Sequence, residues 1–394
     1  MAASNELIHL EDAPTGGTHA LVVGVGHYPY LAGGGKEVPE HGGMGQLSSP
    51  PVSARAFADW LLREYAFAAR PLASVALLLS EPGRRRYANP RDGTTHTVPK
   101  ATIENLVAAV KAWRVRAAGS AQNRLLFYFC GHGIAHGVDM ALLAEDYNPA
   151  DPNNPLDAAL DFNGLRRGLR SSPAAEQLFF LDACRSTDAV LSDQDEQPYA
   201  GRVPLLYRRR PDDLPALRST PYFATLAGER AFGRPDQVSL FTQALLRGLA
   251  GAGSTKSSGS WKVTTTQLAA SIDDFMRRPV MAGTAALAQI PTANEVSDFE
   301  VHELAGDPRV PVYVSCLPPE DSLLADFSCR SGAAVVLSRP CGEVDPEQEG
   351  DGEWYLEVGP GDYHFEADLR DGRPRARDAF AWPPHLTVRL EAAP

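Results

Sequence analysis

The chain of 394 residues has few cysteines, no excess of positive charge and no long hydrophobic run. Its five cysteines are too sparse, and odd in number, for a disulfide scaffold. The net charge of −12 argues against a nucleic-acid partner bound through bulk charge, because affinity for phosphate comes mainly from lysine and arginine. The longest apolar runs, such as residues 125–129, are far too short to span a bilayer, so we expect no membrane partner.

The first residues, MAASNELIHLEDAPTGG, lack the basic stretch followed by an apolar stretch that marks a signal peptide. We therefore expect a cytoplasmic, reducing location, in which a reactive thiol would stay free. Hydrophobic residues make up 44% and charged residues 22% of the chain, which is typical of a folded protein.

The distribution of charge divides the chain into two regions. Residues 307–394 contain 17 acidic and 8 basic residues, a net charge of −9, whereas the rest of the chain is nearly balanced. Gly306, Pro308 and Pro311 are typical of a linker at this point. We therefore predict an N-terminal tail over residues 1–17, a main domain over 18–306 and an accessory domain over 307–394.

Short apolar runs alternate with amphipathic helical patterns in the main domain. This alternation predicts an α/β fold with a mostly parallel sheet that helices cover on both faces. In such sheets, chemistry gathers just beyond the carboxyl ends of the strands. Two segments rich in glycine, serine or proline, residues 33–51 and 251–260, are predicted to be loops. The predicted strands cover residues 19–28, 74–80, 124–133, 176–184 and 221–227, and the predicted helices cover residues 51–67, 100–118, 161–172, 239–249 and 264–278.

The accessory domain has a different pattern. Five short strand-like runs, VPVYVSC, AAVVLS, EWYLEV, DYHFEADL and LTVRLEA, are separated by Gly, Pro and Asp turns. No helical segment of useful length appears among them. This pattern predicts a small all-β sandwich.

Two strand ends in the main domain carry reactive side chains. The third predicted strand ends in YFCGHG, with His132, and the fourth ends in FLDACRS, with Cys184. Neighbouring parallel strands would bring these two residues side by side. A thiol needs a base or a cationic neighbour to become a thiolate near neutral pH, and imidazole, with a pKa of about 6.5, suits this role. The unobstructed amide of Gly133 is a candidate donor to a developing oxyanion.

These motifs resemble those of the caspase-like clan (peptidase C14), and within it the prokaryotic metacaspase-like proteases. In caspases a Gln-Ala-Cys motif follows a histidine by about 50 residues. Here Asp-Ala-Cys-Arg-Ser follows Gly-His-Gly, with Cys184 placed 52 residues after His132. The resemblance covers roughly residues 18–300, from LVVGVGHY to QIPTANE. It implies a caspase-like sheet, a catalytic Cys–His dyad, and an oxyanion hole made by the amides of Gly133 and Cys184.

The residue two positions before the nucleophile lines the S1 pocket in this clan. Caspases have glutamine there and cleave after aspartate, whereas metacaspases have aspartate and cleave after arginine or lysine. Asp182 occupies the position here, so we predict cleavage after Arg, and secondly Lys. Metacaspases often add a second acid on the next strand, where this chain has Ala227. Glu229 is the candidate substitute, and Asp139 and Asp146 are weaker candidates.

The segment after Cys184, over residues 188–219, has two interpretations. One is a solvated surface loop. The other is an activation loop that the enzyme cuts itself, because its arginines match the predicted preference. The candidate cleavage residues are Arg202, Arg208, Arg209 and Arg210.

The acidic residues of the same segment, Asp188, Asp193, Asp195 and Glu196, raise the question of a metal. Some metacaspases require Ca²⁺, but these acids lack the regular ligand spacing of an EF-hand. Calcium activation is therefore kept as an alternative, and no cofactor is predicted to be required. His132 and His136 do not predict a metal site, because the glycines around them argue against a helix and no HExxH glutamate is present.

Taken together, these residues predict a cysteine endopeptidase that acts on proteins with exposed Arg or Lys. The β domain, through its Pro-Gly-Xaa-Tyr turn in residues 356–369, is the candidate site for an activator or regulator. A bacterial stress, defence or cell-death role follows from family analogy alone. The alternative is a catalytically silent caspase-like scaffold that acts by binding proteins. An α/β hydrolase is not favoured, because no Gly-x-Ser-x-Gly elbow occurs.

Overall fold

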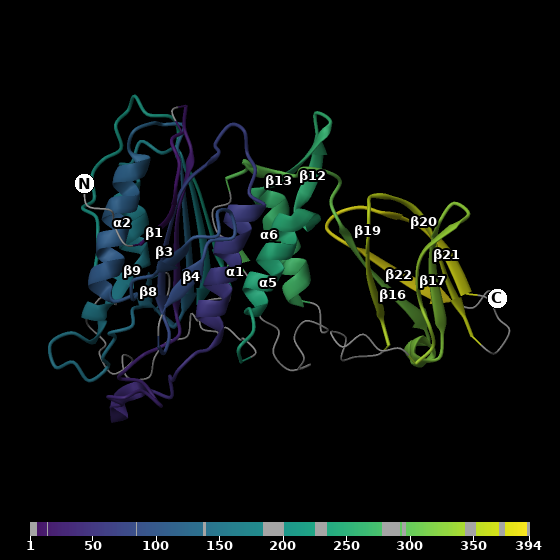
Figure 1. Ribbon diagram of the computed structural model, residues 1–394, viewed down its shortest axis with the longest axis horizontal. Coiled ribbons are helices and arrows are strands. Elements are labelled where there is room, and N and C mark those ends of the chain that lie inside the picture. The colour runs from purple at the N-terminus through teal and green to yellow at the C-terminus, as the bar shows by residue number, and fades with distance from the viewer. Residues whose placement is uncertain are drawn as a thin grey trace. The chain divides into compact units, whose positions relative to one another are not determined.

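The computed structural model describes residues 6–13, 15–83, 85–136, 139–183, 201–224, 235–277, 292–293, 297–342, 352–369 and 375–391. They belong to two compact units (Figure 1), which are Met1–Gln243 with Gln289–Phe299 and Ala244–Ala288 with Glu300–Pro394.

A seven-stranded sheet forms the centre of the first unit. The pairs β2–β3, β2–β6, β6–β10 and β10–β11 are parallel, and the two edge pairs, β1–β3 and β11–β14, are antiparallel. Every residue of β2, β3, β6 and β10 is buried, as expected for continuous apolar strands covered on both faces. The predicted α/β fold with a mostly parallel sheet is confirmed. In spatial order the strands are β1 (Leu7–Leu10), β3 (Leu72–Ser80), β2 (Thr18–Val25), β6 (Arg124–Gly131), β10 (Glu176–Ala183), β11 (Arg218–Phe223) and β14 (Thr292–Ala293).

Helices α1 (Ser49–Arg63) and α2 (Ile103–Ala117) cover opposite faces of this sheet. Phe57 of α1 stacks on Tyr128, with ring centroids 4.6 Å apart, whereas Trp113 of α2 lies 6.1 Å from Phe127. Because successive residues of a strand point to opposite faces, Phe127 and Tyr128 place the two helices on different sides. Figure 1 shows α1 and α2 on either side of β1 and β3.

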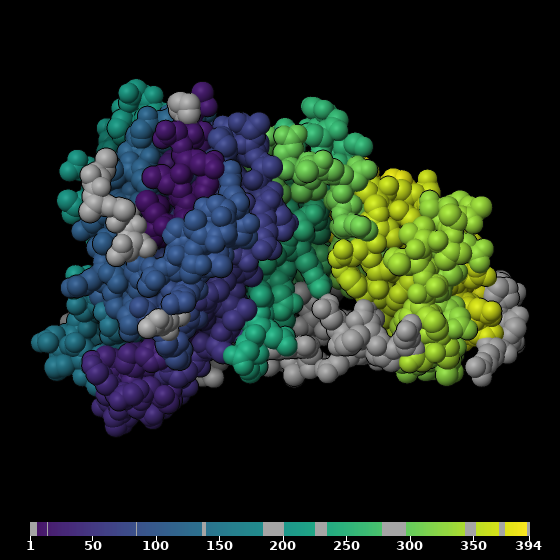
Figure 2. All heavy atoms as spheres, in the orientation of Figure 1, coloured from purple at the N-terminus to yellow at the C-terminus, as the bar shows by residue number. Residues whose placement is uncertain are grey.

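The first unit has further short elements. One strand, β1, falls within the residues predicted as an N-terminal tail, and the purple N-terminal residues are visible at the surface of this unit in Figure 2. The remaining elements are η1 (Pro39–His41), β4 (Arg86–Ala88), β5 (Thr95–Thr97), β7 (Gly133–His136), β8 (Asp139–Leu143), η2 (Pro155–Ala158), β9 (Ala159–Asp161), α3 (Phe162–Leu169) and the start of α5 (Leu240–Arg247).

The second unit contains the β sandwich predicted for the end of the chain. Two sheets, with strand orders β19-β16-β22 and β18-β17-β20-β21, enclose a separate apolar core that includes Val314, Phe327 and Phe365. The strands are β16 (Val310–Leu317), β17 (Asp326–Ser331), β18 (Ala334–Arg339), β19 (Trp354–Val358), β20 (Gly361–Asp368), β21 (Arg375–Ala381) and β22 (Leu386–Glu391), and η4 (Pro319–Leu323) joins β16 to β17.

The second unit also includes residues that precede the predicted linker. Strands β12 (Ser254–Ser257), β13 (Ser260–Thr264) and β15 (Glu300–Glu303) form a sheet beside η3 (Gly248–Ala252) and α6 (Thr265–Arg277). Residues 251–260, predicted as a loop, instead supply most of the β12–β13 hairpin. Trp261 packs against Trp382 with ring centroids 4.6 Å apart, which ties this hairpin to the C-terminal strands.

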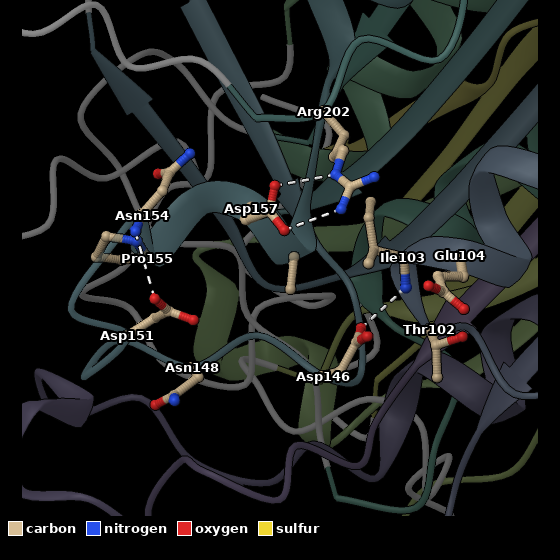
Figure 3. A pocket seen from close by; sticks show the side chains of 11 residues that line it. Thr102, Ile103, Glu104, Asp146, Asn148, Asp151, Asn154, Pro155, Asp157 and Arg202 are labelled. Carbon is tan, nitrogen blue, oxygen red and sulfur yellow. Dashed lines mark hydrogen bonds and ion pairs between the residues drawn. The ribbon is translucent and has the colours of Figure 1, made fainter.

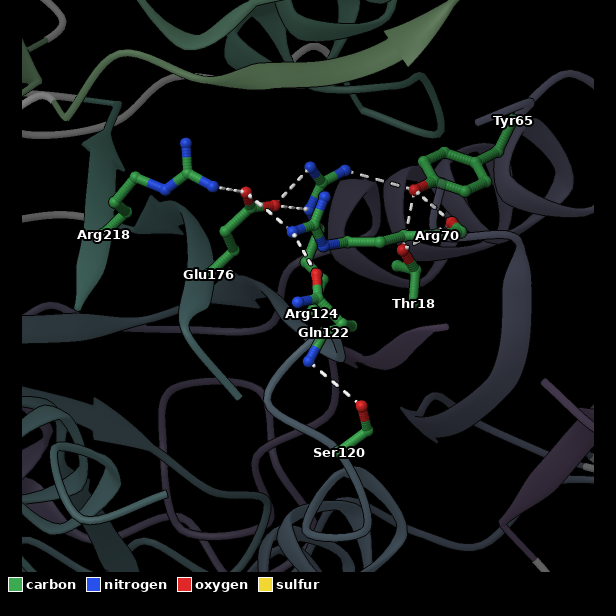
Figure 4. A network of polar contacts seen from close by, with 8 residues as sticks. All are labelled: Thr18, Tyr65, Arg70, Ser120, Gln122, Arg124, Glu176 and Arg218. Carbon is green, nitrogen blue, oxygen red and sulfur yellow. Dashed lines mark hydrogen bonds and ion pairs between the residues drawn. The ribbon is translucent and has the colours of Figure 1, made fainter. Parts of the chain in front are cut away.

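A buried ionic network joins the amino ends of the parallel strands in the first unit (Figure 4). Glu176, the first residue of β10, is 1% exposed and accepts a hydrogen bond from Arg124 Nε at 2.9 Å. Arg218 at the start of β11 and Arg70 also pair with this carboxylate. One glutamate therefore pairs with three arginines at the edge of the sheet opposite the carboxyl ends. Among the described helices, none is long and apolar enough to cross a membrane.

Candidate active site

The strand register brings the two predicted motifs to one edge of the sheet. Asp182 of β10 lies opposite Cys130 of β6, which in turn lies opposite Gly24 of β2. His132 directly follows β6 at this edge. Cys184, the proposed nucleophile, follows β10 directly in the sequence and lies outside the described residues, as does Glu229.

His132 is buried and held by two backbone contacts. Its Nε2 lies 2.8 Å from the carbonyl oxygen of Gly45, and its own amide donates to the hydroxyl of Tyr28 at 2.8 Å. A carbonyl oxygen can only accept, so this contact assigns the proton of the neutral ring to Nε2. Nδ1 is then unprotonated. Burial lowers the pKa of His132, although the bond to Gly45 partly opposes this effect. The imidazole is therefore neutral near pH 7 and able to accept a proton.

The position of Gly45 depends on a segment that the sequence presents only as a glycine-rich loop. Gln46 holds this segment in place. Its Oε1 accepts from the backbone amide of Tyr28 at 2.9 Å, and its Nε2 donates to the Tyr28 carbonyl at 2.8 Å. Gly45 also forms a bridge with Ala32. No motif marks a carbonyl acceptor in a sequence, so sequence reasoning missed Gly45 and Tyr28.

Gly133, the predicted oxyanion donor, begins β7 immediately after His132. It lies opposite Leu142 of β8, and the carbonyl of His132 accepts from the Leu143 amide at 3.0 Å. The small β7–β8–β9 sheet thus fixes the backbone just past the end of β6.

The Asp182 carboxylate is 4% exposed and has hydroxyl partners. Its Oδ2 accepts from the hydroxyl of Ser239 and, at 2.7 Å, from that of Thr242. Burial raises the pKa of Asp182, and these hydroxyls together with the thiol of Cys130 oppose the rise. Ser239 and Thr242 were not singled out in the sequence. Their only signal is their place at the start of the predicted helix 239–249.

The weaker acid candidates are engaged elsewhere. Asp139 accepts from the Asn163 side chain at 2.9 Å, and Asp146 accepts from the Ile103 amide at the start of α2, also at 2.9 Å. Among the described cysteines, Cys130 is buried, and burial, followed by the charge of Asp182, raises its thiol pKa well above the usual range. A raised pKa makes Cys130 a poor nucleophile, in agreement with a core role.

A polar pocket of about 310 Å³ lies at the start of α2 (Figure 3). Arg202 spans part of it, with its Nε and Nη2 donating to the two carboxylate oxygens of Asp157 at 3.0 and 2.9 Å. Neither His132 nor Asp182 lines this pocket. The residues that do are Thr102, Ile103, Glu104, Asp146, Asn148, Asp151, Asn154, Pro155, Asp157, Ala158 and Arg202.

The four candidate cleavage arginines have different surroundings. The backbone of Arg202 bonds to Ala159 and Asp161 of β9, and the guanidinium of Arg210 donates to three carbonyl groups. Arg208 and Arg209 are exposed. The acidic residues considered for Ca²⁺ lie outside the described residues. In the part of the chain that the structure describes, no group of three or more His, Cys, Asp or Glu side chains is arranged to hold a metal ion.

Comparison with known proteins gives a family match over most of the chain. A family model described as the caspase domain (Peptidase C14) matches residues 18–297. An uncharacterized protein of Sinorhizobium fredii, y4kE, is 29% identical over 274 residues, which are 68% of this chain and 77% of that protein. A probable protease of a Desulfuromonadales bacterium is 26% identical over 163 residues, which are 40% of this chain and 18% of that protein.

Solved structures give more distant matches. The crystal structure of protein GSU0716 from Geobacter sulfurreducens matches with a TM-score of 0.42 and 17% identity, over 71% of this chain and 94% of that one. Caspase-1 from Spodoptera frugiperda matches with a TM-score of 0.42 and 14% identity, over 73% of this chain and 91% of that one.

Proposed function

We propose that this chain, which belongs to the caspase domain family and is a cysteine-type peptidase, cleaves proteins after basic residues with a Cys184–His132 dyad. The observation that carries the proposal is the state of His132. Its ring is buried at the end of β6, its Nε2 proton points to Gly45, and its Nδ1 is unprotonated. A base in this state, at the edge of the sheet where β10 leads into Cys184, suits activation of a thiol.

In the proposed mechanism, Nδ1 of His132 accepts the proton of the Cys184 thiol as the sulfur attacks the scissile carbonyl carbon. The amides of Gly133 and Cys184 donate to the oxyanion of the tetrahedral intermediate. The intermediate collapses, the C–N bond breaks, and the imidazolium returns the proton to the leaving amine. Water, deprotonated by the same imidazole, then hydrolyses the thioester and releases the second product.

The proposed specificity rests on Asp182. A carboxylate in a site shielded from water favours a cationic P1 side chain and disfavours an anionic one. Arginine is preferred to lysine, because a planar guanidinium can donate two hydrogen bonds to one carboxylate. Glu229 is proposed as the second acid of this pocket.

Self-processing is proposed for the exposed end of the 188–219 segment. A protease binds its substrate as an accessible, extended chain, and backbone pairing with β9 holds Arg202 against such binding. By contrast, Leu206 and Tyr207, which directly precede Arg208, are 80% and 66% exposed. This contrast favours Arg208 or Arg209 over Arg202 as the cleavage residue.

The biological setting is the last part of the proposal. Family analogy supports a cytoplasmic effector of bacterial stress, defence or cell death. The acidic C-terminal strands are proposed to bind the regulator, because the net charge of −9 over residues 307–394 suits a basic partner. Calcium activation is tested alongside the main experiment.

The test is cleavage of a peptide library that varies only at P1, with and without Ca²⁺. The wild-type protein should cleave Arg-P1 peptides best, then Lys-P1, and leave Asp-P1 peptides intact. Cys184→Ala and His132→Ala should each abolish cleavage. Full activity of Cys184→Ala, or cleavage only after Asp, would overturn the proposal. A folded wild-type protein that cleaves no peptide under either condition would favour the silent scaffold.

A further inference from the structure

We infer that Ser239 and Thr242 are specificity-positioning residues, whose hydroxyls hold the Asp182 carboxylate ready for the cationic P1 side chain of a substrate. The inference rests on the proposed function, in which Asp182 is the acid that P1 meets. It adds two residues that neither the sequence motifs nor the family match assigns. We use the name hydroxyl cradle for four connected hydroxyls, those of Ser53, Tyr128, Ser239 and Thr242.

Asp182 has no cationic partner among the described residues. Besides burial, the described groups that shift its pKa are two hydroxyls and a thiol. A buried carboxylate usually has a charged partner, because an unpaired charge in a protein interior is costly. The described part of the first unit therefore offers this buried carboxylate no counter-ion. A guanidinium or ammonium group of a substrate would supply one.

The hydrogen bonds of the cradle hydroxyls all run toward the Asp182 carboxylate. Each hydroxyl has one proton, and those of Ser239 and Thr242 point to Asp182 Oδ2. The Tyr128 hydroxyl, 2.6 Å from the Thr242 oxygen, must then donate to it. Ser53 likewise donates toward the carboxylate: its hydroxyl donates to the Ser239 hydroxyl at 3.3 Å and accepts from the Ser239 amide at 3.0 Å.

Hydroxyls that donate to a carboxylate stabilise its ionised form. Ser239 also accepts from the Thr242 amide at 3.3 Å, so it caps the start of α5 as well as donating to the carboxylate. The positive end of the α5 dipole faces the same carboxylate and favours its negative charge.

The cradle hydroxyls come from separate elements of the fold. Ser53 is on α1, Tyr128 is on β6, and Ser239 and Thr242 flank the start of α5. Among the described residues, the titratable groups that face Asp182 are Tyr128 and the thiol of Cys130, both on β6. Both are neutral near pH 7, since burial raises the pKa of each. The Ser239 and Thr242 hydroxyls, together with the Cys130 thiol, are therefore the described groups that orient the carboxylate.

The experiment compares two peptides that differ only in the charge at P1, one with arginine and one with the neutral isostere citrulline. The measured quantity is the ratio of their kcat/KM values for wild type, Thr242→Val and Ser239→Ala. We expect each variant to lower the ratio about 10-fold, through KM for the arginine peptide, because a hydrogen bond to a charged group is lost. Cleavage of the citrulline peptide should change less than cleavage of the arginine peptide.

Two variants control for structural effects. Thr242→Ser keeps the hydroxyl and should keep the wild-type ratio, which also covers the case in which Thr242→Val folds poorly. Thr220→Val removes another fully buried threonine hydroxyl, on β11, which donates to the Ser297 carbonyl and accepts from the Ser297 amide. It should leave the ratio unchanged.

The outcomes separate this inference from the function on which it rests. A wild-type enzyme that cleaves both peptides equally overturns the role of Asp182, and the inference with it. A preference for arginine that Asp182→Asn abolishes but Thr242→Val and Ser239→Ala preserve overturns the inference alone. The inference also fails if these two variants slow both peptides equally, since that result marks a purely structural role.

Discussion

Strand β10 carries a buried carboxylate near each end, and the two have opposite kinds of partner. Glu176 at the amino end pairs with Arg70, Arg124 and Arg218. Asp182 near the carboxyl end has only hydroxyl and thiol donors among the described residues. The first arrangement gives the carboxylate its counter-ions, whereas the second gives it none among the described residues. The difference teaches that the amino end of this sheet holds the strands together through charge, and it agrees with the proposal that the carboxyl end receives a cationic side chain.

The largest expected effect is on stability at the amino end. Glu176→Gln should lower the free energy of unfolding by about 3–5 kcal/mol, because it leaves the fully buried Arg124 without its counter-ion. Asp182→Asn should change it by less than about 1 kcal/mol, because the amide oxygen can still accept from the same hydroxyls. Urea unfolding of the two variants measures both values. Equal losses would show that the two carboxylates do not differ in this way.

A smaller and separable effect is expected from pH at the carboxyl end. Burial raises the pKa of Asp182 above 3.8, so it loses its charge as the pH falls through that raised value. The preference for arginine over citrulline should therefore decline at a pH above 3.8. Burial lowers the pKa of His132 below 6.5, so cleavage of both peptides should be lost together only as the pH falls through that lowered value.

The pH experiment has a clear control in the ratio itself. Protonation of His132 affects both peptides alike and cancels in the ratio, so a pH-dependent ratio isolates Asp182. A ratio that stays constant down to pH 3.8 would contradict the role of this carboxylate. An acid limb for the citrulline peptide above pH 6.5 would contradict the neutral state of His132.

The smallest stability effect is expected for a charge that is already paired at the surface. Arg202→Gln breaks the ion pair with Asp157. The Arg202 and Asp157 side chains are 47% and 58% exposed, so the free energy of unfolding should fall by at most about 1 kcal/mol. Arg202→Gln should leave the self-cleavage pattern unchanged, whereas a combined Arg208→Gln and Arg209→Gln variant should abolish it. Mass spectrometry of the purified chains measures the pattern. A cut after residue 202 in the wild type would contradict the assignment.

Much of the sheet could be predicted because its signals are local. The continuous apolar runs at residues 74–80, 124–133 and 176–184 correspond to β3, β6 and β10 within a few residues at each end. The alternation of strands with helices was enough to place His132 and Asp182 at one edge. The β12–β13 hairpin was missed because its polar, glycine- and serine-containing residues resemble a loop, and pairing with β15 decides the outcome.

The candidate site was predicted less completely, for a physical reason. A histidine and an aspartate can be recognised as residue types, but the groups that set their proton states come from distant parts of the chain. Gly45 acts through a backbone carbonyl, which every residue has. Ser239 and Thr242 are ordinary residues at the start of a helix, and only their contact with Asp182 distinguishes them.

The sequence alone determined that this chain forms a mostly parallel sheet, that a β sandwich follows it, and that its motifs are those of caspase-like peptidases. The two folds follow from periodicity, which is a property of neighbouring residues, and the family follows from the resemblance of two short motifs. The tertiary structure decided that His132 is buried with Nε2 against the Gly45 carbonyl, which lowers its pKa and leaves Nδ1 as the acceptor of the neutral ring, and that Asp182 is buried without a cation among the described residues. Burial and hydrogen bonding between distant segments set both properties, because desolvation and donor direction exist only once the segments are packed together.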